Sequence, residues 1–429
     1  MPKRFVKNAR ALSSTPLRRD ALAILEAGLK AVETSAAVRR AVRRDGDRLK
    51  IGSRAYRLSR FKNVYLVAIG KAAFDASMEL EKILGKRLID GLALDVKGGA
   101  LARVASRVGT HPYPSLQNMK ATGEIMALLK HAEADDLVIA VVSGGGSAML
   151  CWPTQLTCKE LSSLTEMLMR KGAAIQEMNT VRKHTSDIQG GQLAQLAYPA
   201  RVAGLIFSDV PGDDLSTVAS GPTFLDPTTK ADAARVLAKY DLLKACRLPR
   251  CELKETPKEA KLFDHVANTQ VVSGAQAVEA MKEEARRLGY RPRVFSAAVT
   301  GEAREVGERF ARSVKPGEAL IAAGETTVTI SGKGGEGGRN QALALSALPL
   351  VHDDALVLSC ATDGIDHTPA AGAIADLVTR EAAKRKGLDP ERSLSRHDEF
   401  PFFSAAGAHI LTGVTGMNVS DVMLGLRRK

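Results

Sequence analysis

The chain has little of what would place it among nucleic-acid-binding, membrane or disulfide-rich proteins. Only 4% of its 429 residues are aromatic, with a single tryptophan, which leaves few rings on which nucleic acid bases could stack. No apolar run approaches the roughly 20 residues that span a bilayer. The five cysteines form an odd, scattered set without a C-x-x-C pair, so neither a disulfide framework nor a zinc site is indicated. We therefore expect a protein of the reducing cytoplasm, with no nucleic acid and no membrane as partner.

Two familiar signatures of phosphate-handling enzymes are also missing. The chain has no G-x-x-x-x-G-K-[ST] loop, and it has no protein-kinase H-R-D or D-F-G set. Its length is enough for two or three domains, and its 45% hydrophobic and 25% charged residues are those of an ordinary globular protein. If such a protein transfers phosphate, it uses neither of these two architectures.

Positive charge is concentrated near the N-terminus. Residues 1–60 hold sixteen Lys/Arg and five Asp/Glu, out of a net charge of +13. This excess could indicate a nucleic-acid arm or a transit peptide. However, residues 21–32 have the pattern of a folded amphipathic helix, and no clear cleavage pattern follows the acid-poor first 19 residues. We favour a solvated basic face near an anionic substrate.

Short apolar runs alternate with helical patterns through the first half of the chain. The predicted strands are residues 64–69, 91–96, 137–142 and 202–207, and the clearest helices are 117–132 and 158–172. Repeated strand–helix units predict a parallel sheet covered by helices. Polar loops follow three of these strands directly, at 70–71, 143–147 and 208–214. Ligands bind beyond the carboxyl ends of such strands, so we expect these loops to gather at one edge.

A second alternating region follows a charged, proline-containing segment at 247–264. Further short strands are predicted at 269–272, 293–296, 319–323 and 356–359, with an antiparallel edge strand at 327–330. We therefore predict an α/β fold of two domains, an N-terminal Rossmann-like domain over 1–250 and a C-terminal domain over 260–429. Each is expected to contain a mostly parallel sheet covered by helices, with the active site in the cleft between them.

The most informative local motif follows the strand at 137–142. Three glycines stand between two hydroxyls, in the order Ser143, Gly144, Gly145, Gly146, Ser147. Glycines let backbone N–H groups converge beside a helix N-terminus, where an anion such as phosphate binds. On its own, the segment fits equally well a tight strand-to-helix turn without a ligand.

A second glycine-rich loop, residues 331–341, allows more than one interpretation. Gly332, Gly334 and Gly337 match G-x-G-x-x-G literally, with acidic residues downstream, as in dinucleotide-binding proteins. The preceding segment alternates in polarity, however, and the loop is long and charged. Because the loop ends in Arg339, whose planar fork matches phosphate oxygens, it suits a triphosphate better. A flexible surface hairpin is the third interpretation.

Two acidic loops also follow predicted strands. Asp209, Asp213 and Asp214 follow one strand, and Asp363 and Asp366 follow another. Carboxylates at strand ends hold Mg²⁺ near phosphates. An isolated Asp-Gly pair is more often only a turn.

Nine segments in this order resemble the class II glycerate 2-kinases, whose C-terminal part is called the MOFRL domain. They are Ile69-Gly-Lys-Ala-Ala, Val142-Ser-Gly-Gly-Gly-Ser-Ala, Asn179-Thr-Val-Arg-Lys-His, Gly190-Gly-Gln-Leu-Ala, Ser208-Asp-Val-Pro-Gly-Asp, Ser220-Gly-Pro-Thr, Gly324-Glu-Thr-Thr-Val, Gly338-Arg-Asn-Gln and Thr362-Asp-Gly-Ile-Asp. The resemblance runs from about residue 10 to the C-terminus. It implies ATP-dependent phosphorylation of D-glycerate at the 2-hydroxyl, with a divalent metal such as Mg²⁺, and a two-domain α/β fold. It also leaves a homo-oligomer open.

The resemblance and the chemistry of the motifs together suggest roles for individual residues. Lys71 and Arg339 are expected to bind the transferring phosphate or the glycerate carboxylate, and Asp209 to orient or deprotonate the 2-hydroxyl. Mg²⁺ is expected at Asp363 or Asp209, with help from Glu325. The further expected contacts are Asn179, Lys183 and Asn340. His184 is either a general base or a hydrogen-bonded structural histidine.

Three local departures from the family pattern bear on substrate range. Gln189 stands where Lys is common, Ala342 where Glu is common, and the loop at His367 lacks a frequent acid. Two rival functions stay open at this point. One is an NAD(P)H-dependent hydroxypyruvate reductase, which the literal glycine fingerprint allows. The other is a non-catalytic sensor of phosphate or sugar acid, against which the clustered Lys, Arg and Asp argue.

Overall fold

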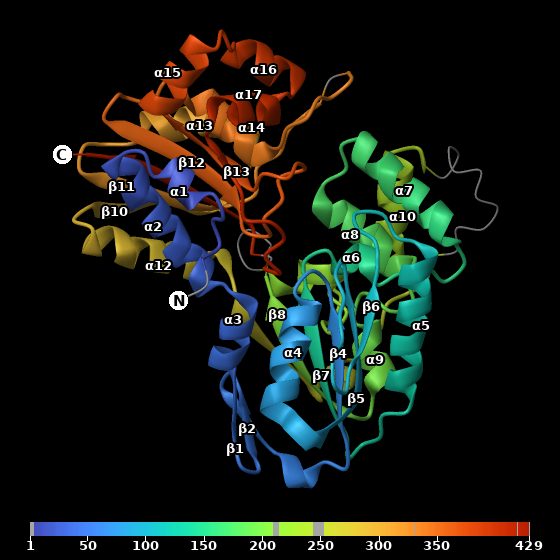
Figure 1. Cartoon of the computed structure of the whole chain (residues 1–429). Helices are drawn as coiled ribbons and strands as arrows, with labels where there is room; N and C mark the ends of the chain where they lie inside the picture. Colours follow the sequence, from blue (N-terminus) through green and yellow to red (C-terminus); the bar gives the residue numbers. More distant parts are fainter. Residues whose placement is uncertain (1–3, 209–213, 243–252, 331, 418, 429) are drawn as a thin grey trace. The chain divides into compact units, whose positions relative to one another are not determined.

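The computed structural model describes residues 4–208, 214–242, 253–330, 332–417 and 419–428, which form two compact units. The first, the parallel-sheet unit, contains residues 37–208 and 214–271 (Figure 1). The second, the mixed-sheet unit, combines residues 4–36 with the chain from 272 onwards. Among the described residues, no helix has the length and apolar character needed to cross a membrane.

A six-stranded parallel sheet forms the centre of the parallel-sheet unit. Its order is β6-β5-β4-β7-β8-β9, with bounds β4 Val64–Ile69, β5 Leu88–Asp95, β6 Ala105–Val108, β7 Leu137–Ser143, β8 Arg201–Phe207 and β9 Val266–Val272. Strand β7 is buried along its whole length and pairs in parallel with both β4 and β8. The parallel sheet predicted from doubly buried apolar runs is confirmed.

Helices cover this sheet, and a helical cluster extends it. The helices are α4 Ala73–Leu84, α5 Leu116–Lys130, α6 Gly146–Met149, α7 Cys158–Arg170, α8 Ile175–His184, α9 Gln192–Ala197 and α10 Lys230–Lys239. Helix α4 packs on β4 and β5, and α5 packs on β5. Helices α7, α8 and α10 share a core of their own with Cys151, Leu156, Leu242 and Leu253. Thr157 and Thr229 begin α7 and α10 with capping boxes.

A small antiparallel meander lies within the basic region. It consists of β1 Val42–Asp45, β2 Arg48–Ile51 and β3 Arg54–Arg57. These strands were not predicted from the sequence. Arg39 and Arg40 lie on α3 (Thr34–Ala41). Alternation in β2 buries Leu49 and Ile51 and leaves its cations exposed. Much of the N-terminal positive charge is therefore a solvated face of folded structure.

The second sheet differs from the prediction. Its order is β10-β11-β15-β12-β13-β14, with bounds β10 Arg291–Val299, β11 Glu318–Gly324, β12 Ala355–Ala361, β13 Gly372–Asp376, β14 His409–Ile410 and β15 Asp421–Arg427. Only β10 and β11 pair in parallel, and the other pairs are antiparallel. The expectation of a mostly parallel second sheet is wrong, because the last strand, β15, inserts between β11 and β12 and runs opposite to both.

Two strand predictions in this region also fail or change sheet. Residues 327–330 form no strand, and only an isolated bridge joins Thr327 to Glu302. The strand predicted at 269–272 is part of β9, which belongs to the sheet of the parallel-sheet unit. In this segment Val328 packs against the core, and Thr329 bonds Glu302.

The N-terminal segment packs with the C-terminal part of the chain. The helices of the mixed-sheet unit are α1 Ala9–Leu12, α2 Pro16–Ala31, α12 Gly274–Arg287, α13 Ala303–Arg312, α14 Arg339–Ala347, α15 Leu377–Arg385, α16 Pro390–Arg396 and α17 Glu399–Ala406. Helix α2 packs on α12, β12 and β15. A buried ion pair joins Arg18 of α2 to Asp376 at 2.7 Å. This division differs from the predicted boundary between 1–250 and 260–429.

Candidate active site

The loops after β4 and β7 are joined directly at the carboxyl edge of the parallel sheet. The Lys71 N–H donates to the Gly144 carbonyl at 3.0 Å, and the Ala72 N–H donates to Ser143 Oγ at 3.2 Å. The Ser143 hydroxyl in turn donates to the Ile69 carbonyl at 2.9 Å. Ser143 is fully buried. The structure therefore brings Lys71 and the glycine loop together, as the sequence predicted, and gives Ser143 the role of tying the two loops.

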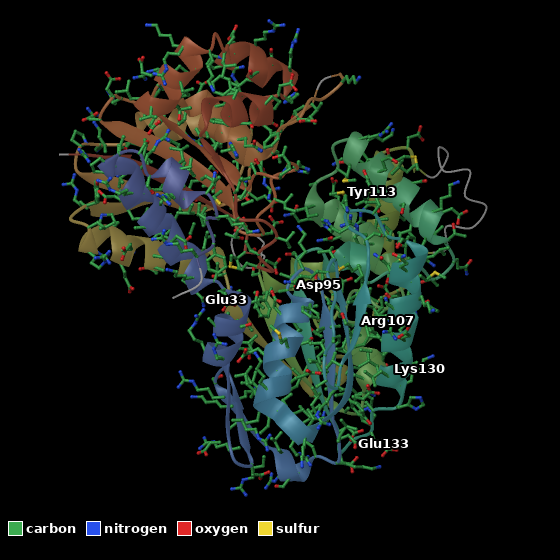
Figure 2. The ribbon with its side chains drawn as sticks, in the orientation of Figure 1. Glu33, Asp95, Arg107, Tyr113, Lys130 and Glu133 are labelled. Carbon is green, nitrogen blue, oxygen red and sulfur yellow. The ribbon has the colours of Figure 1, made fainter. Side chains whose placement is uncertain are left out.

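Asp95, which sequence reasoning missed, lies at the end of β5 beside the same helix start (Figure 2). Its carboxylate accepts the Phe74 N–H of α4 at 2.9 Å. Burial raises the pKa of Asp95 to about 6, although backbone N–H donors and Lys97 act in the opposite direction. A buried aspartate at a strand end is a site signal, but its pairing with α4 is visible only in the fold.

The glycine loop needs its glycines for two different reasons. Gly145 has φ +80, in the left-handed region that favours glycine. A Cβ at Gly146 would lie 2.5 Å from the Cβ of Ala219, so here close packing is the constraint. A Cβ at Gly145 would lie 3.3 Å from Cγ of Lys71, which places the lysine stem against the loop.

Ser147 continues into a polar cluster on two further elements. Its hydroxyl lies 2.9 Å from Ser220 Oγ, which donates to Asn179 Oδ1 at 3.1 Å. Ala219, Ser220 and Gly221 have φ values of 50, 58 and 58. Consecutive left-handed residues other than glycine store strain, and such residues concentrate at functional sites. Asn179 and Ser147 were predicted contacts, whereas Ser220 was only part of a quoted motif.

Lys183 is engaged within the protein. Its ammonium group lies 3.1 Å from Asp226, and both side chains are almost fully buried. Burial raises the pKa of Asp226, but Lys183 and the Thr228 donors outweigh that effect, and the pKa lies below its usual value. His184 is fully buried as well, with Nδ1 2.7 Å from the Lys254 carbonyl. The geometry supports the structural alternative for His184 and an indirect role for Lys183.

Gln189, one of the departures from the family pattern, bonds the backbone at the end of the glycine loop. Its side-chain amide donates to the carbonyls of Ser147 and Leu150 at 2.9 and 2.8 Å. These bonds close the end of the single-turn helix α6. Within the described residues its Oε1 atom is buried without a hydrogen-bond partner.

A separate group of residues surrounds Arg339 in the mixed-sheet unit. Its guanidinium pairs with Asp421 at 2.6 and 3.2 Å and forms an ion pair with Glu325. Burial lowers the pKa of the guanidinium, but the charges of Asp421 and Glu325 outweigh burial and raise that pKa above its usual value. Asp421 begins the central strand β15 and is buried. Sequence reasoning missed it, because it lies 82 residues from Arg339.

The residues next to Arg339 are committed to helix capping. The backbone N–H groups of Asn340 and Gln341 donate to Asp366 at 3.2 and 3.0 Å. Asn340 is buried, and its side chain bonds both Asp366 and Ser359. Asp366 is buried too, and burial together with the charge of Asp421 raises its pKa. These contacts fix the first turn of α14 and hence the base of Arg339.

The glycine-rich loop before Arg339 packs on carboxyl groups. A Cβ added at Gly337 would overlap Glu399, and one at Gly338 would overlap Asp366. The Phe400 N–H donates to the Glu336 carbonyl at 2.9 Å. These two glycines therefore permit a close approach to acidic side chains, which differs from the predicted cradle for a triphosphate.

The predicted metal ligands are only partly described. Asp209 and Asp213 lie outside the described residues. Asp363 is partly buried, and its carboxylate accepts the Ile365 N–H at 3.1 Å in a local turn. In the described part of the chain, no three His, Cys, Asp or Glu side chains are grouped so that they could hold a metal ion. Proteins usually bind Mg²⁺ through one or two carboxylates, water and substrate phosphates, so Asp363 stays a predicted ligand of this ion.

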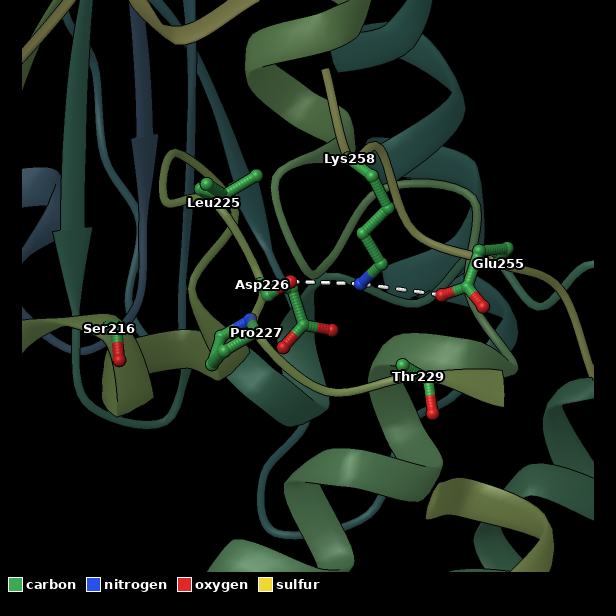
Figure 3. A pocket seen from close by; sticks show the side chains of 7 residues that line it. All are labelled: Ser216, Leu225, Asp226, Pro227, Thr229, Glu255 and Lys258. Atoms are coloured by element: carbon green, nitrogen blue, oxygen red, sulfur yellow. Dashed lines mark hydrogen bonds and ion pairs between the residues drawn. The ribbon is translucent and has the colours of Figure 1, made fainter. Parts of the chain in front are cut away.

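A hollow of the parallel-sheet unit is lined by Asp226, the partner of Lys183 (Figure 3). Its volume is about 600 Å³, and it is lined by Ser216, Leu225, Asp226, Pro227, Thr229, Glu255 and Lys258. Lys258 crosses it and donates to the Asp226 carbonyl at 2.8 Å. The hollow therefore borders the segment that carries Ser220, but Lys71 and the glycine loop do not line it.

Comparison with known proteins settles the family. Residues 20–250 match a family described as "Domain of unknown function (DUF4147)", and residues 318–421 match the MOFRL family. The chain is 35% identical to a glycerate 2-kinase of Pyrococcus horikoshii over 435 residues, which covers 96% of this chain and 97% of the relative. The chain belongs to the glycerate 2-kinase family.

Other members of the glycerate 2-kinase family agree in sequence and fold. A D-glycerate 2-kinase of Thermotoga maritima is 36% identical over 383 residues, covering 85% of this chain and 90% of the relative. A crystal structure of a glycerate kinase from T. maritima matches with a TM-score of 0.81 and 32% identity, over 95% of this chain and 99% of that chain. A crystal structure from P. horikoshii gives 0.78 and 34%, over 97% and 99%. The MOFRL match spans the whole group of Glu325, Arg339, Asp363 and Asp421. The resemblance seen in the sequence is confirmed.

Proposed function

We propose that the protein transfers a phosphoryl group from ATP to the 2-hydroxyl of D-glycerate, giving 2-phosphoglycerate and ADP. The observation that carries this proposal is the similarity to the P. horikoshii glycerate 2-kinase along nearly the full length of both chains. The geometry of the parallel-sheet unit supports it, because a lysine lies against a glycine loop at the carboxyl edge of a parallel sheet.

Phosphoryl transfer requires positioning and charge neutralisation more than covalent chemistry. In the proposed mechanism, Lys71 and the loop from Ser143 to Ser147 hold an anionic group of the substrates. Arg339 neutralises charge that develops on the transferring phosphoryl group, with Asp421 fixing the plane of its guanidinium. The location of the site in a cleft between the two domains stays a prediction.

The acidic residues supply the remaining proposed roles. Asp209 orients or deprotonates the 2-hydroxyl, so that its oxygen can attack the terminal phosphorus. Asp363, with Asp209 and Glu325, would hold Mg²⁺, which neutralises phosphate charge when bound. Lys183 and Asn340 support these groups indirectly, because their polar atoms already bond within the protein.

A hydroxypyruvate reductase is the second candidate function. A protein of Agrobacterium vitis named a putative hydroxypyruvate reductase is 36% identical over 376 residues, which covers 83% of this chain and 85% of that relative. The literal G-x-G-x-x-G favours this alternative. However, no strand directly precedes these glycines in the described residues, because β11 ends at Gly324, and Gly337 packs against Glu399.

Phosphorus NMR of the purified protein with D-glycerate, ATP and Mg²⁺ tests the proposal. We expect a new monoester signal that matches authentic 2-phosphoglycerate. A 3-phosphoglycerate signal would keep the kinase and refute the position of transfer. Unchanged ATP, together with NADH oxidation by hydroxypyruvate in a parallel sample, would replace the kinase with the reductase.

A further inference from the structure

Arg182 of α8 stands out among the partly buried cations of the described structure. Its one described side-chain hydrogen bond runs from Nη1 to Asn179 Oδ1 at 3.5 Å. Burial lowers the pKa of its guanidinium, and no carboxylate of the described residues acts against that shift. Its neighbour Lys183 pairs with Asp226 instead.

Two other arginines that are withdrawn from water have carboxylate partners. Arg18 pairs with Asp376 through two bonds of 2.7 Å, and Arg339 pairs with Asp421. Withdrawing a guanidinium from water without a counter-ion costs free energy. The last turn of α8 offsets part of that cost through the helix dipole, but it supplies no bidentate acceptor.

A series of polar contacts links Arg182 to Ser147 of the glycine loop. Asn179 Oδ1, its partner, also accepts the Ser220 hydroxyl, and Ser220 Oγ lies 2.9 Å from Ser147 Oγ. This places one guanidinium, two hydroxyls and an amide in a chain of contacts. Asn179 and Ser220 are buried, so the orientation of these donors is fixed by the fold.

We propose that Arg182 binds an oxyanion of a substrate in the catalytic cycle. The inference rests on the proposed kinase function, since it assigns the ligand to that site. The planar guanidinium matches a carboxylate or phosphate bidentately, and charge-assisted bonds of this kind are the strong ones. The oxyanion is either the carboxylate of glycerate or a phosphate oxygen of the nucleotide, and the two sources are separable by experiment.

The test compares Arg182→Met and Arg182→Lys with wild type and with Arg170→Met. Arg170 is 78% exposed at the end of α7, where it pairs with Glu166, so it controls for loss of one positive charge. Circular dichroism verifies folding. The readouts are the KM values for glycerate and ATP, each at saturating concentration of the other substrate, and calorimetric binding of D-glycerate.

We expect Arg182→Met to raise one KM by about 10- to 100-fold, the scale of one charged hydrogen-bond pair. A rise for glycerate with weakened glycerate binding assigns the carboxylate, and a rise for ATP assigns a phosphate. Arg182→Lys is expected to recover part of the loss, because it keeps the charge without the fork. It also preserves the test if the Met variant does not fold.

KM values within twofold of Arg170→Met, for both substrates and both variants, would overturn the inference while leaving an active wild-type kinase intact. A wild-type protein without kinase activity would instead refute the proposed function. In that case, calorimetry with inorganic phosphate and with D-glycerate still decides about Arg182. Equal binding by wild type and variants, or none by wild type, refutes the anion site, and binding lost in the variants supports it.

Discussion

At the scale of single residues, the protein uses buried ion pairs in two different ways. The Lys183–Asp226 pair is sealed from solvent and ties α8 to the segment after residue 225. The Arg339–Asp421 pair is open on the arginine side, where the side chain is 26% exposed. Asp421 bonds Nε and Nη2, and Glu325 pairs with Nη1, so the two carboxylates together fix the plane of the guanidinium. Asp421 is therefore a positioning residue for Arg339.

Replacing Lys71 or Arg339 by Ala should lower kcat at least about 100-fold, the usual scale for losing one charge-stabilising donor. Arg339→Lys should recover little, because a single ammonium cannot hold Asp421 and a phosphate with the same geometry. The measurement is steady-state phosphorylation of D-glycerate. Lys86→Ala, at an exposed position of the parallel-sheet unit, is the matched control. Near-normal turnover in both Ala variants would remove Lys71 and Arg339 from the mechanism.

The sequence suggests candidate contact residues, but it does not indicate the residues that hold them in place. Lys71 and the loop 143–147 were found because glycines and a cation follow apolar strands directly. Asp421 and Asp226 were missed because their partners lie 82 and 43 residues away, and only the sheet order brings them together. Asn340 and Lys183 stay predicted contacts, although their side chains bond Asp366 and Asp226, because a polar residue in a motif can serve capping or pairing as well as ligand binding.

At the scale of the elements, the turn from β7 into α6 depends on the strained segment at Ala219. The two meet where Gly146 has no side chain, with only 2.5 Å available to a Cβ. A Cβ at Gly146 and the Cβ of Ala219 are both fixed by the backbone, so neither atom could move aside by rotation of a side chain. The glycine loop and the Ser220 segment therefore keep one another in place.

Gly146→Ala should destabilise the protein by about 1–3 kcal/mol, the scale of overpacking, and lower kcat together with it. Gly172→Ala is the control, since Gly172 has φ +73 but open space around its Cβ position. This substitution should lower the free energy of unfolding only through backbone strain, by about 1 kcal/mol. Urea unfolding and turnover should be measured on both. Activity lost equally in the two variants would show that contact with Ala219 is unimportant.

The packing of α17 against the glycine-rich loop should make stability depend on pH. Glu399 is 1% exposed; burial, with the charges of Asp366 and Asp398, raises its pKa to about 8. The unfolded chain ionises this group near pH 4.5, so between about 4.5 and 8 the folded state binds more protons. Its contribution to stability therefore falls as pH rises, by at most about 1.4 kcal/mol per pH unit.

Glu399→Gln should remove this slope and gain relative stability as the pH approaches 8. Urea unfolding at several pH values between 5 and about 8.5 measures it. Glu391→Gln, at an exposed position on α16 with a side chain 66% exposed, should follow the wild-type curve. Parallel curves for wild type and Glu399→Gln would contradict a protonated Glu399.

The pattern of elements explains where fold prediction worked and where it failed. Doubly buried runs such as β7 indicate strands covered on both faces, and in the parallel-sheet unit their alternation with helices correctly predicted parallel pairing. In the mixed sheet, β11, β12 and β15 are just as buried, so hydrophobicity carries no information on strand direction. The strand directions depend on the connections between the strands, and in particular on the insertion of β15 between β11 and β12.

At the scale of the whole molecule, the chain is organised by contacts between its two ends. Residues 4–36 belong to the same unit as the chain beyond 272, so this unit cannot be completed from one continuous segment. Arg18 of α2 bonds this N-terminal segment to residues near the C-terminal end of the chain. It holds both oxygens of Asp376 and the Thr379 hydroxyl, all at the start of α15.

Arg18→Met should therefore destabilise the mixed-sheet unit by about 3–5 kcal/mol, because it leaves the carboxylate of Asp376 buried without its partner. Arg19→Met is the control, one residue away and exposed. Hydrogen exchange should show lost protection in α2, β13 and α15 together, since the pair joins them, while β4 and β7 of the parallel-sheet unit keep theirs. Loss confined to α2 would mean that the N-terminal helix frays without affecting the sheet. Equal protection in the Arg18 and Arg19 variants would show that apolar packing of α2 alone joins the two ends of the chain.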